Sequence, residues 1–164
     1  MAKRSKRPSP AARTAAARTP AAQPAVVGLR YIESSAFVAA LLEHDAGALH
    51  SLRARSRLIT SALTAAEAGR AIVRARMSER LTPDAEREAV RALRRFERRC
   101  YVVAITDDVL ARVRRPFPVE PVRTLDAVHL ATAETLGEPP QLVTFVTRDD
   151  RVRDNAKALG YVVE

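Results

Sequence analysis

The stretch AVVGLRYIESSAFVAALL, residues 25–42, decides the fold, because its structural pattern changes at Glu33. The part before Glu33 is apolar and β-branched, which predicts a buried strand over 26–32, and the apolar spacing after it predicts a helix over 35–42. In parallel α/β proteins, the junction between a strand and the following helix lies at the edge of the sheet where ligands bind. Glu33 is therefore either a helix-start residue or part of a site.

The rest of the chain repeats this alternation. We expect further strands over 57–60, 101–105, 141–147 and 161–163, and helices over 45–55, 64–76, 83–98, 107–113, 124–136 and 150–159. Pro83, Pro116 and the sequence GEPPQ at 137–141 supply breaks. Strands separated by helices favour a parallel sheet with helices on both faces. The predicted fold class is a three-layer α/β/α domain with a mostly parallel central sheet, over residues 26–164.

The net charge of +9 is concentrated near the N-terminus, since residues 1–27 hold six Lys or Arg residues and no Asp or Glu. Residues 1–25 are rich in Ala, Pro and Arg without apolar periodicity, which predicts a disordered basic tail; a transit peptide has a similar composition. The single cysteine, Cys100, excludes an internal disulfide, and no apolar run reaches the roughly 18 residues of a membrane span. We expect a cytoplasmic protein with no membrane partner.

Four carboxylates lie at or near the ends of predicted strands. Glu33 follows the first strand, Glu67 lies near the start of the helix after the second, Asp126 lies in the first turn of the helix over 124–136, and Asp149 follows the apolar sequence LVTFVTR. Carboxyl ends of parallel strands share one edge of a sheet, so these side chains can converge.

Each acid also has an ordinary structural interpretation. Thr64 and Glu67 have the spacing of a capping box. Asp126 follows a plausible Thr124 N-cap and complements the helix macrodipole, and either Asp149 or Asp150 suits the N-cap of the last helix. Glu33 is harder to explain in this way, because Glu is a mediocre cap.

A cluster of carboxylates has a chemical use when a cation neutralises it. Carboxylates held close together repel one another and raise one another's pKa. Oxygen ligands favour Mg²⁺ or Mn²⁺, and no His/Cys set at zinc spacing occurs in the sequence. Such ions activate water and stabilise displacement at phosphorus, which is the chemistry of a nuclease.

Four motifs in this chain resemble those of PIN-domain ribonucleases, and among them most closely the VapC toxins of prokaryotic toxin–antitoxin pairs. These motifs are YIESSAFVAAL (31–41), ITSALTAAEAGRAI (59–72), RTLDAVHLATA (123–133) and LVTFVTRDDRVRDNAKALGYVV (142–163). The resemblance covers about residues 28–164. It implies a PIN-like domain in which Glu33, Glu67, Asp126 and Asp149 form a catalytic Mg²⁺ or Mn²⁺ site, with Ser34 and Thr147 as supporting hydroxyls. Asp150 is the alternative to Asp149. His129 either borders this site or only packs and bonds locally.

The resemblance also implies a substrate and partners. The expected activity is metal-dependent hydrolysis of RNA, the expected partner is a cognate antitoxin that contacts the helix over 83–98, and a homodimer is expected. Arg30, Arg70, Arg74, Arg148 and Arg151 are candidates for holding the RNA backbone, although Arg70 and Arg74 also suit a solvated helix face.

One motif departs from the family pattern, because Glu33 stands where the family normally has Asp. The alternative function is therefore a catalytically impaired PIN domain that binds RNA or a protein partner.

Overall fold

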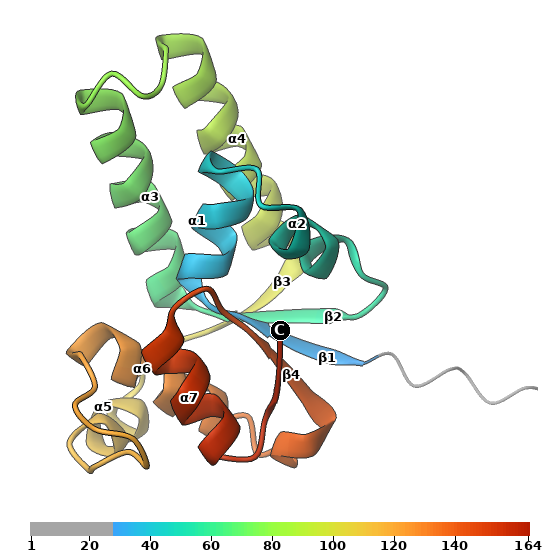
Figure 1. The fold of residues 1–164 in the computed structure, drawn as a ribbon, viewed down its shortest axis with the longest axis vertical. Helices are drawn as coiled ribbons and strands as arrows, with labels where there is room; N and C mark the ends of the chain where they lie inside the picture. The colour runs from blue at the N-terminus through green and yellow to red at the C-terminus, as the bar shows by residue number, and fades with distance from the viewer. Residues whose placement is uncertain (1–27) are drawn as a thin grey trace, which may run out of the picture.

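A five-stranded parallel sheet forms the centre of the computed structural model, which describes residues 28–164 (Figure 1). The strands, in sheet order, are β3 (Cys100–Val103), β2 (Arg57–Ser61), β1 (Leu29–Ile32), β4 (Val143–Val146) and β5 (Val162–Val163). Every neighbouring pair is parallel, and Tyr31 of β1 lies opposite Ile59 of β2 and Phe145 of β4. The predicted tail at 1–25 lies outside the described residues.

Helices cover both faces of the sheet, which confirms the three-layer α/β/α fold. One layer holds α1 (Ser34–Leu42), α2 (Ala46–Arg53), α3 (Ala62–Met77) and α4 (Pro83–Arg99), drawn above the sheet in Figure 1. The other layer holds α5 (Asp107–Val113), α6 (Thr124–Glu134) and α7 (Asp150–Ala158). The short 3₁₀ helix η1 (Pro140–Leu142) leads into β4.

Alternate side chains of the central strands supply a separate core to each layer. Tyr31 and Phe145 pack under α5, α6 and α7, whereas Ile32 and Val146 pack with Phe37 and the other apolar side chains of α1 to α4. Successive strand side chains point to opposite faces, so a strand between two helical layers must be apolar on both. This explains why Tyr31 and Ile32, which point to opposite faces, are both large, apolar and buried.

The helices α3 and α4 form a long hairpin that extends away from the sheet (Figure 1). Thr82 accepts a hydrogen bond from the Ala85 N–H at 3.2 Å, and Pro83 occupies the first turn, so the turn residues themselves start α4. Phe96 of α4 stacks on Phe37 of α1 with ring centroids 4.1 Å apart. The opposite face of α4 carries arginines in local ion pairs, as its sequence predicts.

The predicted elements are all present, but several bounds differ. The first strand begins at Leu29, and the predicted strand over 141–147 is shortened because Pro139 and Pro140 direct the chain into η1. Asp45 lies outside α2 as its N-cap, accepting from the Ala48 N–H at 2.6 Å. Within residues 28–164 no helix combines the length and the apolar character needed to cross a membrane.

Candidate active site

The structure places all four predicted carboxylates at the carboxyl edge of the sheet. Glu33 joins β1 to α1, Glu67 lies in the second turn of α3, Asp126 lies in the first turn of α6, and Asp149 joins β4 to α7. In Figure 1 the N-terminal ends of α1, α3 and α7 meet at this edge. The parallel topology therefore brings together residues that are far apart in the sequence.

Glu33 is buried, and hydrogen-bond donors surround its carboxylate. Oε1 accepts from the Ser34 hydroxyl at 2.6 Å and from the Ser35 N–H at 3.0 Å. Oε2 accepts from the Thr147 hydroxyl at 2.9 Å and from the Ser35 hydroxyl. By accepting from the Ser35 N–H, Glu33 also serves as the N-cap of α1. Ser34 and Thr147, the two predicted supporting hydroxyls, both contact Glu33.

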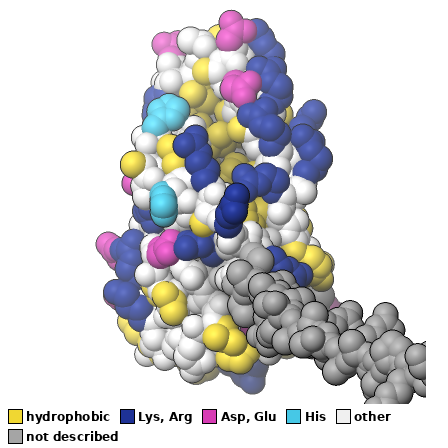
Figure 2. Space-filling model, turned by 90° about the vertical axis from the view of Figure 1, so that its right-hand side faces the viewer, with side chains coloured by type: hydrophobic (Ala, Val, Ile, Leu, Met, Phe, Trp, Pro, Cys, Tyr) yellow, Lys and Arg dark blue, Asp and Glu magenta, His cyan; other side chains and the backbone are white. Residues whose placement is uncertain are grey.

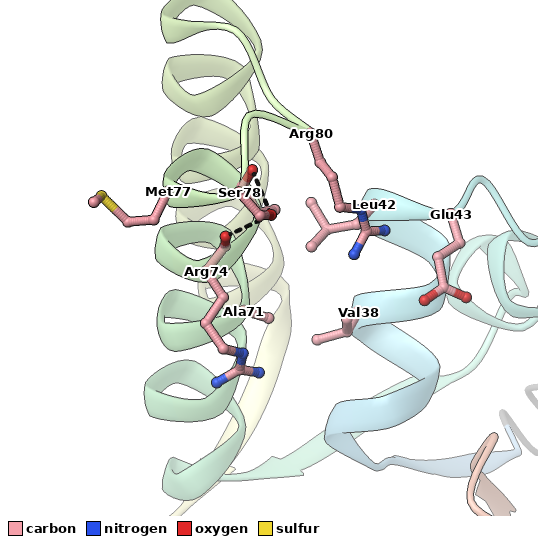
Figure 3. Close-up of a pocket in the computed structure, with 9 residues that line it drawn as sticks. Val38, Leu42, Glu43, Ala71, Arg74, Met77, Ser78 and Arg80 are labelled. Atoms are coloured by element: carbon pink, nitrogen blue, oxygen red, sulfur yellow. Dashed lines mark hydrogen bonds between the residues drawn. The ribbon is translucent and has the colours of Figure 1, made fainter.

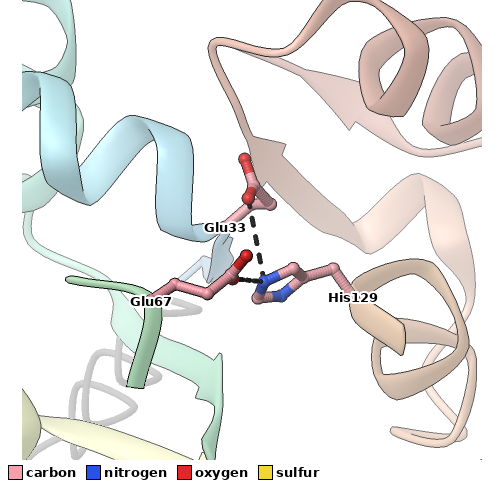
Figure 4. Close-up of side chains that lie close together, drawn as sticks. All are labelled: Glu33, Glu67 and His129. Carbon is pink, nitrogen blue, oxygen red and sulfur yellow. Dashed lines mark hydrogen bonds and ion pairs between the residues drawn. The ribbon is translucent and has the colours of Figure 1, made fainter. Parts of the chain in front are cut away.

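Glu67 is linked to the core through His129, and Figure 4 shows the imidazole lying between Glu67 and Glu33. His129 Nε2 is 2.8 Å from Glu67 Oε2 and 3.7 Å from Glu33 Oε1, while Nδ1 is 3.1 Å from the Tyr31 hydroxyl. Burial, followed by the charge of Glu33, raises the pKa of Tyr31 well above its usual range, so this hydroxyl keeps its proton. Both ring nitrogens of His129 therefore have a side-chain partner, Tyr31 at Nδ1 and Glu67 at Nε2.

These contacts revise two interpretations of the sequence. The helix α3 starts at Ala62 with Ser61 as its N-cap, so Thr64 and Glu67 form no capping box. Thr64 instead accepts a hydrogen bond from the Thr60 hydroxyl at 2.8 Å. His129 is buried and locally bonded, but its partner is a carboxylate of the cluster, so it also borders the site. Burial is the largest single influence on the pKa of Glu67 and raises it, but hydrogen bonding to His129 and Ser34, together with the charges of His129 and Arg74, lowers this pKa below its usual value.

Asp149 and Asp126 differ in the hydrogen bonds that their carboxylate oxygens accept. Asp149 Oδ1 caps α7 by accepting from the N–H groups of Arg151 and Val152 at 2.9 and 3.1 Å, so the N-cap role belongs to Asp149 and not to Asp150. Asp126 Oδ2 is buried without a hydrogen-bond partner. The predicted Thr124 N-cap is wrong, because α6 begins at Thr124 and its N-cap, Arg123, makes no side-chain cap bond.

Asp126 has the electrostatic features of a ligand without its cation. Burial raises the pKa of Asp126, and the negative charges of Asp149, Glu33 and Glu67 raise it further. A buried carboxylate oxygen that lacks a donor and faces other carboxylates is costly unless a cation neutralises it. The donor set fits a divalent cation that prefers oxygen ligands. Among residues 28–164, the ligand atoms that lie within 4.8 Å of one another belong to Glu33, Glu67 and His129, and this group does not include Asp126 or Asp149. Both ring nitrogens of His129 already have hydrogen-bond partners.

Comparison with known proteins identifies the family of this chain. The PIN domain family matches residues 30–158. The chain belongs to the PIN-domain family. Within it the chain is VapC-like: it is 38% identical over 137 residues to Ribonuclease VapC35 of Mycobacterium tuberculosis, covering 81% of this chain and 93% of that protein. It is also 38% identical to Ribonuclease VapC46 of the same organism, covering 81% of this chain and 94% of that protein.

Two solved structures share the PIN fold at low sequence identity. The crystal structure of VapBC2 from Rickettsia felis bound to a promoter DNA fragment aligns with a TM-score of 0.57 at 11% identity, covering 83% of this chain and 97% of that one. The VapBC-1 structure from nontypeable Haemophilus influenzae aligns with a TM-score of 0.52 at 12% identity, covering 83% and 96%. Both confirm the fold expected for this PIN domain.

The candidate backbone-binding arginines of this PIN domain fall into two groups. Arg30 pairs with Glu164, and Arg148 pairs with Asp45 at 2.8 Å, so structural ion pairs hold both side chains. Within residues 28–164 the other three have no ion-pair partner; they are Arg70, Arg74 and Arg151. Only this second group is available for a phosphate without breaking an existing pair.

Proposed function

We propose that this PIN domain is a metal-dependent endoribonuclease, a VapC-like toxin that hydrolyses RNA phosphodiester bonds with Mg²⁺ or Mn²⁺. The observation that carries the proposal is the orphaned Asp126 Oδ2 beside Glu33, Glu67 and Asp149. The relatives named Ribonuclease VapC35 and VapC46 support the same chemistry and the same substrate class.

In this proposal Glu33, Glu67, Asp126 and Asp149 hold the divalent ion. The ion supplies an activated water and neutralises the charge that develops on the phosphate. Hydroxyls from Ser34 and Thr147 fix the orientation of the Glu33 carboxylate, and His129 fixes that of Glu67. Such prior orientation lowers the cost of assembling the reactive geometry, because the side chains are already in place when RNA arrives.

A specific observation favours the alternative of a catalytically impaired PIN domain. Both oxygens of Glu33 already accept two hydrogen bonds each, and one of these caps α1. A shorter Asp side chain at this position would not reach the same donors in the same way. If the Glu33 carboxylate keeps its hydrogen bonds to α1 and does not bind the ion, the ion has one ligand fewer. The domain would then bind RNA or a protein without cutting RNA.

The test is cleavage of total RNA by the purified full chain with Mn²⁺ or Mg²⁺, compared with EDTA and with Asp126→Ala. Discrete fragments that require both the ion and Asp126 are the expected result. Intact RNA from the wild-type chain in every ion, with cleavage by Glu33→Asp, would identify the impaired alternative. Intact RNA from both proteins would contradict the nuclease proposal.

A cognate antitoxin is the proposed protein partner, and an apolar groove along α4 is its proposed contact. The groove consists of two connected cavities of about 200 and 310 Å³ that share Ala92, and Figure 2 shows apolar side chains flanked by basic ones on this face. Leu41, Leu52 and Phe96 supply apolar surface, while Arg53 and Arg99 lie on the rim. A segment with apolar anchors and acidic flanks fits this groove by helix-in-groove or extended binding.

The homodimer remains a prediction from the family resemblance, and the cytoplasmic location remains a prediction from the composition of the sequence. Light scattering of the purified chain over a range of concentrations measures its molar mass and so tests for the homodimer. A constant monomer mass across that range would contradict the expected dimer.

A further inference from the structure

Two hollows run end to end along α3, starting at the carboxylate cluster. The first, of about 420 Å³, is lined by Leu63, Glu67, Arg70, Arg74 and Leu125. The second, of about 650 Å³, lies between α1 and the far half of α3, and Arg74 lines both. Arg74 follows Glu67 by seven residues, which is about 10 Å along a helix axis. The two hollows therefore form one path from the site to the end of α3.

The far part of this path is apolar on its floor and basic on its edges (Figure 3). Val38 and Leu42 project from α1, Arg74 projects from α3, and Arg80 reaches over Leu42 from the turn after α3. Glu43 is the one acid that lines this hollow. The surface thus combines cationic groups with apolar contacts.

The arginines of this path differ from those of α4 in their pairing. Arg70, Arg74 and Arg80 are exposed and have no ion-pair partner among residues 28–164, and residues 1–27 contain no acid. On α4, by contrast, Arg87 pairs with Asp84, and Arg91 and Arg95 pair with Glu88. Arg94 and Arg98 of α4 also lack an ion-pair partner among residues 28–164, so the difference in pairing concerns Arg87, Arg91 and Arg95. Neither Arg94 nor Arg98 lines the two hollows, whereas the free arginines of the path do.

We propose that Arg70, Arg74 and Arg80, here called the α3 track, bind the sugar-phosphate backbone of single-stranded RNA on one side of the bond that is cut. This inference rests on the proposed function and specifies its substrate path. The distance of about 10 Å from Glu67 to Arg74 exceeds the rise of about 3.4 Å per nucleotide of even a fully stacked strand, so the track reaches beyond the nucleotide at the site. The apolar side chains along the track offer contact to unpaired bases, which a duplex would keep stacked away from the protein.

The position and spacing of the track favour RNA over an acidic segment of the antitoxin. Its near end is Glu67, where the cation expected at the carboxylates would receive the phosphate that is to be cut. The three basic side chains are distributed along α3 and the turn after it, which suits a polymer with a charge on every unit. An acidic peptide is the competing occupant and is an outcome of the experiment.

The experiment measures binding apart from cleavage. A fluorescein-labelled 12-nucleotide oligouridine is titrated with the full chain carrying Asp126→Asn, in Mg²⁺, over a range of KCl concentrations. The track variant adds Arg74→Gln and Arg80→Gln. The control adds Arg87→Gln and Arg91→Gln on α4, which removes the same charge, so a general change in net charge affects both equally. Melting curves establish that both variants are folded.

Loss of two phosphate contacts from a single strand should lower the slope of log affinity against log salt by about 1.4, and we expect affinity about 10-fold weaker at 0.1 M KCl. The control should keep most of the original slope. Equal slopes for the two variants would overturn the proposal. If the Arg74→Gln, Arg80→Gln variant lost affinity for the antitoxin but kept its affinity for RNA, the proposal would also be overturned. The α3 track would then be a binding surface for the antitoxin.

Cleavage by the chain with Asp126 intact is measured separately, so the two proposals fail independently. Track-dependent RNA binding without cleavage in any ion would support the track and contradict the nuclease. Metal-dependent cleavage, together with an RNA affinity that does not change in the Arg74→Gln, Arg80→Gln variant, would support the nuclease proposal and contradict the α3 track.

Discussion

At the scale of single residues, the carboxylates of the site differ in whether hydrogen-bond donors surround their negative charge. Glu33 accepts four hydrogen bonds, whereas Asp126 has a buried oxygen with none. A satisfied buried carboxylate holds the fold together, but an unsatisfied one beside other acids destabilises it. Substitutions that remove these two charges should therefore change stability in opposite directions.

Asp126→Asn should stabilise the metal-free protein at pH 7. Burial and the neighbouring acids raise the pKa of Asp126 above its ordinary value of 3.8, so the folded state binds this proton more tightly than the unfolded state. Its contribution to stability is present at low pH and is lost as pH rises from about 3.8 through the higher folded-state pKa. We expect a gain of less than about 1 kcal/mol, because solvent partly screens this half-buried group.

Urea unfolding in EDTA at pH 7 and at pH 3.5 measures this difference. The gain of Asp126→Asn over wild type should shrink at the lower pH, where Asp126 is protonated. Asp107→Asn is the matched control, because Asp107 is exposed in the first turn of α5 and is not among the groups that shift the pKa of Asp126. A gain that is the same at both pH values would mean that the charge of Asp126 is not its cause.

Glu33→Gln should destabilise the protein by about 1–2 kcal/mol, because an amide presents a donor where the Thr147 and Ser35 hydroxyls now donate. Relief of repulsion at Asp126 offsets only part of this loss, since burial is the larger cause of its raised pKa. Thermal melting in EDTA measures the effect. A higher melting temperature for Glu33→Gln would show that repulsion dominates over the hydrogen bonds.

The positions of the four acids at the edge of the sheet were predictable from sequence, whereas their hydrogen bonds were not. Their positions at strand ends follow from local patterns and parallel topology. The contact between His129 and Glu67 joins residues that are 62 positions apart, and the Thr147 bond to Glu33 joins residues 114 apart. The sequence signal for this contact is the position of His129 one helical turn after Asp126, which places both side chains on the same face of their helix. Side-chain geometry across layers depends on how the helices pack, which local periodicity does not encode.

At the scale of elements, the sequence predicts the order of helices and strands because each apolar pattern is long enough to show its period. The errors lie at the ends. The strand predicted over 101–105 stops at Val103, where pairing with β2 ends at Ser61. The capping of α3 by Ser61 lengthens the N-terminal end of that helix by two residues, about half a turn, relative to the helix predicted over 64–76. Pairing partners and caps, rather than propensity, set these boundaries.

Phe96→Ala should loosen the contact between α4 and α1. Phe96 is buried and stacks on Phe37, so its removal leaves a cavity that the remaining side chains fill only in part. We expect a loss of about 3–5 kcal/mol, measured by urea unfolding. Phe96→Leu should lose less, because it refills most of the volume. A loss below about 1 kcal/mol for Phe96→Ala would contradict tight packing of α4 on α1.

At the scale of the whole molecule, the site joins the two helical layers across the sheet edge. Glu33 and Glu67 come from the side of α1 and α3, while Asp126 and Asp149 come from the side of α6 and α7. Each layer has its own apolar core. A cation bound by acids of both layers would therefore connect two bodies that otherwise contact each other mainly through the sheet.

Millimolar Mn²⁺ should consequently raise the melting temperature of the full chain by mass action, with about 2.7 kcal/mol gained when the free ion exceeds its Kd 100-fold. Asp126→Asn should lose most of this rise, and Asp107→Asn should keep it. Hydrogen exchange should slow at the starts of both α3 and α6, because the ion is held from the two layers at once. An equal Mn²⁺ shift in wild type and Asp126→Asn would remove Asp126 from the ligands, and protection confined to one layer would contradict a cation shared between them.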